Sequence, residues 1–170
     1  MTEKVKRKHE ELSRYEGYIR PRVGGLLFVN DHLLLVQQQS MFDQDRFHWL
    51  PPGGGVAFGE PLHRAVCREF HEETGLLVKA GRLLYLNEFI YEKVHAVEFY
   101  FEVRLDGGGQ QMRLGTDPEL PGHQQIIRDL KWHPVHSIQS LDFIPRLAGL
   151  RLEDDYRAGF PTNPVLLQKS

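Results

Sequence analysis

The pattern of apolar and polar positions along the chain predicts strands on both sides of one early helix. Five apolar or alternating stretches predict strands: residues 22–29, 32–39, 82–90, 97–105 and 126–132. In the clearest of them, Tyr100 faces the polar side, whereas one face carries only apolar side chains: Val97, Phe99, Phe101, Val103 and Leu105. Asn30 and Asp31, between the first two stretches, predict a tight hairpin turn.

The predicted helix follows the first pair of strands. Leu62, Ala65 and Val66 recur at the i, i+3, i+4 spacing of one helical face. Pro61 fits the first turn, where its missing N–H costs nothing, and Gly75 fits the position just past the end. These residues therefore predict where the helix begins and ends.

The remaining segments predict loops and a helical C-terminal part. Residues 43–55, with two prolines and three glycines, predict a loop, and 115–125 predict a second, polar loop. Residues 137–158 predict one or two helices, interrupted or started at Pro145, and the last ten residues predict a loosely ordered tail. Strands around an early helix, with helices at the end, predict an α/β domain with a mixed sheet.

Composition narrows the class of protein. The 170 residues suit one domain, 1–170, and the apolar fraction of 41% with 26% charged residues is that of a globular protein. The formal charge of -2 gives no reason to expect nucleic acid as a partner, and the basic start predicts only a solvated arm over 1–19. No run of about 18 apolar residues or signal peptide predicts a membrane partner. Cys67 is the only cysteine, so we expect a reducing, cytoplasmic location.

Three acids interrupt the apolar face of the predicted helix. Glu69, Glu72 and Glu73 continue the face that Leu62 and Ala65 begin. A solvated helix face is the usual explanation of such a cluster. However, Glu69 and Glu73 are like charges one turn apart, and no Lys or Arg lies four residues after any of the three. A local rule broken without local compensation indicates a functional site.

The chemistry of these acids favours a metal ion. Carboxylates that converge at the edge of a core need positive charge, and an all-oxygen donor set favours Mg²⁺, with Mn²⁺ as a substitute. Because Mg²⁺ often takes further ligands from substrate phosphates, the cluster predicts phosphoryl chemistry with a metal-activated water. The glycines of residues 53–55 let the backbone approach an anion or metal closely.

These features together resemble the signature of the Nudix hydrolase family. The family's pattern is matched at all nine of its positions: Gly54, Glu60, Arg68, Glu69, Phe70, Glu72, Glu73, Gly75 and Leu76. The wider similarity covers a core of residues 20–145, which leaves 146–170 as a C-terminal helix and tail. The resemblance implies an α/β/α sandwich with a mixed sheet. It also implies hydrolysis of a nucleoside diphosphate linked to a further group X, a small-molecule nucleotide substrate, and a possible homodimer.

The same resemblance implies roles for individual residues. Glu69, Glu72 and Glu73 would bind the metal, with the carbonyl oxygen of Gly53 as a further ligand. Arg68 would orient one of the glutamates, although a surface salt bridge to Glu72 is an equal alternative.

The general base and the substrate contacts stay open at this stage. Either Glu69 or Glu119, in the later acidic loop, is a candidate general base. Arg20, Arg22 and Arg46 are candidates for phosphate binding, and no residue identifies X. Two other readings remain: a Nudix domain that senses a ligand without catalysis, and an interaction domain whose glutamates are only a solvated face.

Overall fold

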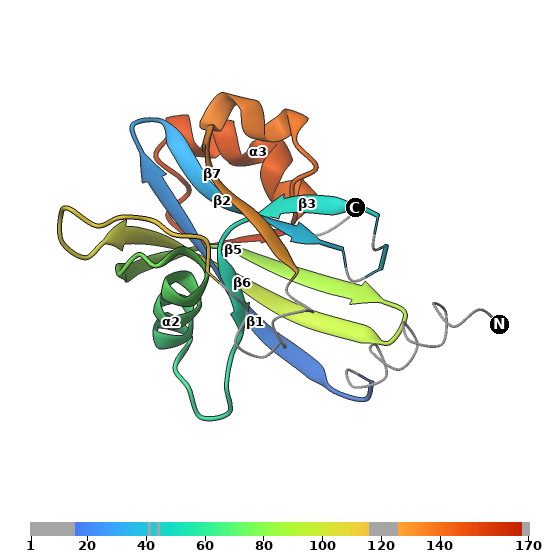
Figure 1. The fold of residues 1–170 in the computed structure, drawn as a ribbon. Helices are drawn as coiled ribbons and strands as arrows, with labels where there is room; N and C mark the ends of the chain where they lie inside the picture. Colours follow the sequence, from blue (N-terminus) through green and yellow to red (C-terminus); the bar gives the residue numbers. More distant parts are fainter. Residues whose placement is uncertain (1–15, 41, 44, 116–125, 168–170) are drawn as a thin grey trace.

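The computed structural model describes residues 16–40, 42–43, 45–115 and 126–167. In order along the chain its elements are β1 (Ile19–Val29), β2 (His32–Gln39), β3 (Phe47–Leu50), β4 (Gly53–Gly55), α2 (Leu62–Thr74), β5 (Val78–Tyr91), β6 (Val94–Leu105), β7 (Ile127–Pro134), the 3-10 helix η2 (Val135–Ser140), α3 (Arg146–Arg157) and β8 (Val165–Leu167) (Figure 1).

The strands form one mixed sheet in the order β3-β2-β1-β6-β5-β8, with β4 paired to β1 and β7 paired to β2. β1 is parallel to β6 but antiparallel to β2 and β4, so it joins the two parts of the sheet. The pairing of β4 with β1 places Gly53 opposite Gly24 and Gly55 opposite Arg22. This register brings the glycine segment against the strand that carries two of the candidate arginines.

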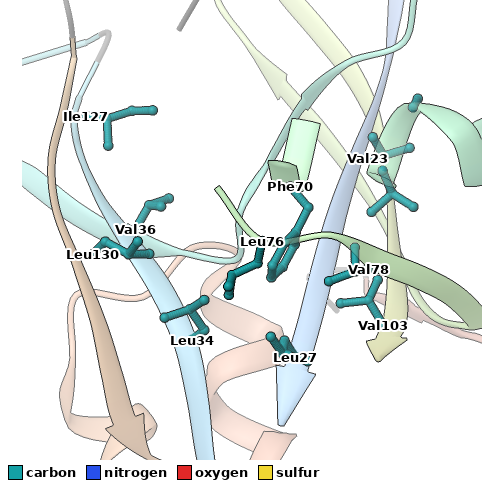
Figure 2. Packing of buried hydrophobic residues seen from close by; sticks show 12 residues of the cluster. Val23, Leu27, Leu34, Val36, Phe70, Leu76, Val78, Val103, Ile127 and Leu130 are labelled. Atoms are coloured by element: carbon teal, nitrogen blue, oxygen red, sulfur yellow. The ribbon is translucent and has the colours of Figure 1, made fainter. Parts of the chain in front are cut away.

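Both faces of the sheet are buried, because helices cover each of them. On one face α2 inserts Ala65, Val66 and Phe70, all fully buried, and Figure 2 shows Phe70 lying over the sheet residues Leu27 and Val103. On the other face α3 contributes Ala148 and Leu152 to a second hydrophobic cluster. The sheet residues of this cluster are Leu26, Leu33, Leu35, Leu84, Tyr85 and Tyr100. The layers are therefore helix, sheet and helix, which confirms the predicted α/β/α sandwich (Figure 1).

Local sequence signals for turns and helix ends are confirmed. Asn30 and Asp31 have φ angles of 49° and 57°, the left-handed backbone that a tight two-residue hairpin needs. Gly75 ends α2 in the left-handed conformation, with φ 71°, and its N–H donates to the carbonyl oxygen of His71. Pro145 directly precedes α3, which confirms a helix start at that proline.

Three expectations were wrong. Residues 43–55 are not all loop: they contain β3 and β4, whose hydrogen bonds come from β2 and β1. The predicted tail contains β8, which pairs with β5. Tyr100 does not face solvent, since α3 and its neighbours cover that side of β6 as well, and it is only 6% exposed.

The division into an arm, a core and a C-terminal part stays a prediction, because residues 1–15 lie outside the described residues. Within the part of the chain that the structure describes, no helix has the length and apolar character needed to cross a membrane.

Candidate functional site

The helix α2 carries the acidic residues on the edge of its buried face. Ala65, Val66 and Phe70 fix that face against the sheet. Glu73 follows Phe70 on the same side and is 6% exposed, whereas the side chains of Glu69 and Glu72 are 12% and 27% exposed. The three glutamates therefore lie at different depths, with Glu72 the most exposed and Glu73 buried, on the helix face that the spacing predicted.

Glu73 connects α2 to the glycine segment β4. Its Oε2 accepts a hydrogen bond of 2.9 Å from the backbone N–H of Gly53. A hydrogen bond from a backbone N–H to a carboxylate is charge-assisted, and it is stronger than one between neutral groups. This contact fixes the position of β4 relative to the helix.

Two neighbouring glycines in β4 are required by close contacts of different kinds. A Cβ at Gly53 would lie 2.7 Å from the Cα of Gly24, and backbone cannot move aside there. A Cβ at Gly54 would lie 2.7 Å from Oε1 of Glu69, the flexible end of a side chain. The glycines thus let β4 run between β1 and the carboxylate of Glu69.

Arg68 uses its whole guanidinium group within the site. Its Nε and Nη2 donate to the two carboxylate oxygens of Glu60 at 2.9 and 2.8 Å, a bidentate pair, and Nη2 also donates to the carbonyl oxygen of Gly55 at 3.1 Å. Its Nη1 donates to Oε1 of Glu69 at 2.8 Å and to Oε2 of Glu72 at 3.2 Å. One cationic nitrogen therefore lies between two carboxylates.

The titration of these groups reflects their surroundings. Burial raises the pKa of Glu69 above its ordinary value, and the negative charge of Glu72 adds to the rise, while Arg68 partly offsets it. Hydrogen bonds from Arg68 lower the pKa of Glu60. In turn, the carboxylates of Glu60 and Glu69 raise the pKa of Arg68. Its surroundings thus disfavour the ionised form of Glu69, which additional positive charge would stabilise.

A pocket of about 370 Å³ opens beside these carboxylates. Its lining includes residues 18–21, at and just before the start of β1, and residues 55–57, which lie beside them because the N–H of Val56 donates to the carbonyl oxygen of Pro21. Arg68, Glu69 and Glu72 complete the lining from α2. The structure therefore brings four of the predicted site residues into one cavity: Arg20, Arg68, Glu69 and Glu72.

The other predicted site residues lie around this cavity or away from it. Arg22 lies on β1 with its Nε 3.7 Å from Oε1 of Glu98, and its charge lowers the pKa of Glu69. Arg46 donates from Nη2 to Oδ2 of Asp142 at 2.9 Å and does not line the pocket. Glu119 lies outside the described residues.

The donor set fits a hard divalent cation in its chemistry. Glu69 and Glu72 are oxygen donors that already share one cationic nitrogen. In the described residues no three acidic, histidine or cysteine side chains lie close enough together to hold a metal ion. Glu73 accepts a hydrogen bond from Gly53 instead, and Glu69 and Glu72 accept hydrogen bonds from Arg68. A cation shared by Glu69 and Glu72 would take over part of the role of Arg68 and leave its bidentate pair with Glu60.

Sequence reasoning missed two parts of the site. It named Glu60 only as a position of the family pattern and did not predict its bidentate pair with Arg68. It also did not identify Tyr18 and Ile19, which line the pocket and are each 55% exposed. The sequence signal that could have found them is two apolar residues, Tyr18 and Ile19, directly before Arg20.

Comparisons with known proteins agree with this fold and identify a family. A family model described as NUDIX domain matches residues 19–151. The chain is 29% identical over 143 residues to an ADP-ribose pyrophosphatase of Methanocaldococcus jannaschii, covering 74% of this chain and 82% of that protein. It is 32% identical over 112 residues to a diphosphoinositol polyphosphate phosphohydrolase of Homo sapiens, covering 63% of this chain and 59% of that protein. The chain thus spans less than two thirds of the human relative.

A solved structure shares the fold at low sequence identity. It is a NUDIX hydrolase from Nitrosomonas europaea, 20% identical, with a TM-score of 0.65 over 90% of this chain and 98% of that chain.

Proposed function

The chain belongs to the Nudix hydrolase family, and on that premise we propose that it is a metal-dependent pyrophosphohydrolase of nucleoside diphosphate derivatives. Water would attack one phosphorus of the substrate's pyrophosphate group, the bond from that phosphorus to the bridging oxygen would break, and two phosphate-bearing products would leave. The family as a whole acts on small phosphoanhydride substrates and generally uses divalent metals such as Mg²⁺.

One observation carries the proposal: the carboxylates of Glu69 and Glu72 share the Nη1 nitrogen of Arg68 at the wall of the pocket. Two acids held together in this way form a preorganised site for positive charge. The alternative is that the glutamates are only a solvated helix face. That alternative does not explain why the acids are largely buried and line a cavity.

We propose Glu69, Glu72 and Glu73, with the carbonyl oxygen of Gly53, as the groups that hold Mg²⁺ or Mn²⁺. When bound, the metal would polarise a phosphate oxygen and lower the pKa of a bound water. Arg68 is proposed as a positioning residue, because its bidentate pair with Glu60 holds it beside Glu69 and Glu72.

The proton of the attacking water needs a carboxylate acceptor. Glu69 is one candidate, since it lines the pocket and burial raises its pKa toward the range useful for a general base. Glu119 is the other. Gly115 donates its N–H to the carbonyl oxygen of Glu73 at 2.8 Å, and four residues reach at most about 14 Å. The chain that leads to Glu119 therefore starts beside α2.

Arg20 is proposed to bind a substrate phosphate, because it lines the pocket that contains Glu69 and Glu72. Arg22 would act on the same site through its positive charge, which lowers the pKa of Glu69. The ion pair of Arg46 with Asp142 gives that arginine a structural partner, so a substrate contact there stays a prediction. No role for nucleic acid or a membrane is proposed, and a cytoplasmic location and a homodimer remain proposals.

The test is product analysis with a panel of ADP-ribose, nucleotide sugars, nucleoside triphosphates and dinucleoside polyphosphates in the presence of Mg²⁺. Cleavage should be lost in Glu72→Gln and on addition of a chelator. Glu153→Gln is the matched control, since Glu153 is also half of a helical i,i+4 pair with an arginine, on α3. It should leave cleavage unchanged.

Two other results would separate the alternatives. Metal binding without cleavage of any substrate would favour a ligand sensor. Cleavage or metal binding that is unaffected by Glu72→Gln would show that the glutamates are only a solvated face.

A further inference from the structure

A segment without regular secondary structure, residues 110–115, covers the carboxyl end of α2, and we call it the capping segment. The backbone N–H of Arg113 donates to the carbonyl oxygen of Thr74 at 2.8 Å. The N–H of Gly115 donates to the carbonyl oxygen of Glu73, also at 2.8 Å. The last four carbonyl groups of a helix have no N–H partner within the helix. The capping segment thus supplies partners for two of them, in the turn of α2 that carries the last two acids of the site.

The capping segment touches α2 backbone to backbone at Gly115. A Cβ at this position would lie 2.7 Å from the carbonyl carbon of Glu72 and 2.7 Å from that of Glu73, too close for a real side chain. Glycine, which has no Cβ, lets the chain run this close to the helix. A displacement of the capping segment would therefore act directly on the peptide groups of the two residues whose side chains are proposed to hold the metal.

Gln110 fixes the other end of the capping segment. Its Oε1 accepts a hydrogen bond of 2.6 Å from the N–H of Leu77, and its Nε2 donates to the carbonyl oxygen of the same residue at 3.0 Å. Nε2 also lies 3.1 and 3.3 Å from the carbonyl oxygens of Asp106 and Gly107. Because Leu77 lies just past the end of α2, the side chain of Gln110 joins the capping segment to the helix that it covers.

The other side chains of the capping segment are not anchored by burial. Arg113 is exposed, and Met112 and Leu114 are 42% and 49% exposed. In the part of the chain that the structure describes, the side-chain hydrogen bonds of this segment all come from Gln110. A segment with few buried contacts opens at a lower free energy than the core does. Gln110 is therefore the side chain that keeps this segment closed on α2.

We propose that Gln110 is a positioning residue of the site: it holds the capping segment against α2 and thereby fixes the turn from which Glu72 and Glu73 reach a metal ion. The inference rests on the proposed function, because it takes these glutamates as metal ligands. Ligands that are already held in place bind a metal more tightly than ligands on a frayed helix end, which must be ordered when the metal binds. Loss of the Gln110 side chain weakens metal binding although every ligand is still present.

The experiment compares two variants of the full chain, one at each end of the capping segment. Gln110→Met keeps the length of the side chain but removes its hydrogen bonds. Gly115→Ala places a methyl group against the backbone of α2. Each variant has a matched control. Gln139→Met removes an exposed glutamine that donates to the carbonyl oxygen of Leu150, and Gly108→Ala adds a Cβ in open space, in the turn just before the capping segment.

Hydrogen exchange at the amide of Arg113 should be faster in both variants than in the wild type and the two controls. Calorimetric titration should show Mn²⁺ bound about tenfold more weakly by both variants, the lower end of the range for groups that orient metal ligands. Cleavage at low Mn²⁺ should fall with the affinity, and saturating Mn²⁺ should restore it. Thermal melts without metal establish that each variant is folded.

Three results would overturn the proposal. Unchanged exchange at Arg113 in Gln110→Met would show that the capping segment is held without this side chain. Faster exchange with unchanged Mn²⁺ affinity would show that the segment does not position the ligands, and the proposed function would still stand. A wild-type protein that binds no Mn²⁺ would refute both. If the Mn²⁺ affinity depends on Gln110 but no substrate is cleaved, the positioning role stands and the enzymatic proposal fails.

Discussion

Glu73 of the helix α2 accepts a hydrogen bond from the backbone N–H of Gly53, 20 positions earlier in the chain. A residue expected to bind a metal thus also holds the glycine segment in place in this structure. Structural and chemical roles of Glu73 can be separated, because a glutamine keeps an oxygen that accepts the same hydrogen bond while losing the negative charge.

Glu73→Gln should keep the fold and weaken metal binding, whereas Glu73→Ala should also lower stability. The alanine leaves the Gly53 N–H without its partner, at a cost of about 1–3 kcal/mol. Melts without metal and calorimetric titration with Mn²⁺ measure the two effects. A glutamine variant that melts many degrees lower without metal would show that the charge itself is structural.

The neighbours Gly53 and Gly54 should respond differently to alanine. Gly53→Ala places a Cβ against backbone of β1 and should destabilise the protein by about 1–3 kcal/mol, the usual cost of overpacking. At Gly54→Ala the three atoms nearest to the new Cβ all belong to the carboxylate of Glu69, so the protein should fold but lose activity as Glu69 moves. Urea unfolding and kcat provide the comparison, and equal stability of the two variants would contradict it.

Arg68→Lys should lower kcat/KM by about 10- to 100-fold, the range found for groups that orient metal ligands. Lysine keeps the charge but lacks the planar fork that serves Glu60 and Glu69 at once. Arg157→Lys is the control, since Arg157 pairs only with Glu153 on the surface of α3 among the contacts described. Equal activity of both variants and the wild type would remove Arg68 from the site.

The attachment of α3 should be sensitive to acid. Burial raises the pKa of Asp155, but hydrogen bonds from Arg151 and from the Tyr85 hydroxyl outweigh it, so the pKa lies below its ordinary value. A carboxylate with a lowered pKa stabilises the fold above its unfolded pKa of about 3.9 and loses this contribution as pH falls through the folded pKa.

Asp155→Asn should therefore lower the free energy of unfolding at pH 7 by about 1–3 kcal/mol, since it disturbs a buried charged hydrogen-bond group. As the pH falls through the pKa of the folded state, the wild-type carboxylate gains a proton, and the gap between the two proteins should narrow. Urea unfolding at pH 7 and across a series of acidic pH values is the measurement. A gap that is constant across pH would mean that the charge of Asp155 does not contribute.

Features set by short spacings were predictable from the sequence. The face of α2, its end at Gly75 and the turn at Asn30 and Asp31 depend on residues within a few positions of one another, and all are confirmed. The gathering of Glu69 and Glu72 at one pocket follows from the same helical spacing, since residues three apart share a face.

Features set by distant contacts were not predictable. β8 is a short segment that becomes a strand because β5, far away in the chain, offers it backbone partners. The pairing of Arg46 with Asp142 joins residues 96 positions apart, so nothing near Arg46 indicated it. Tyr18 lines the same pocket as Glu69 and Glu72, residues more than 50 positions later, and nothing near Tyr18 indicated that.

The short strand β8 has a consequence for the handling of this protein. β8 is the edge strand of the sheet on that side, and it pairs with Tyr85, Leu86 and Asn87 of β5. Truncation before Val165 would uncover the backbone N–H and C=O groups there, and an open strand edge is a template for association between molecules. Shortened versions of the chain should therefore be more prone to aggregation, and fusion partners are better placed at the other end.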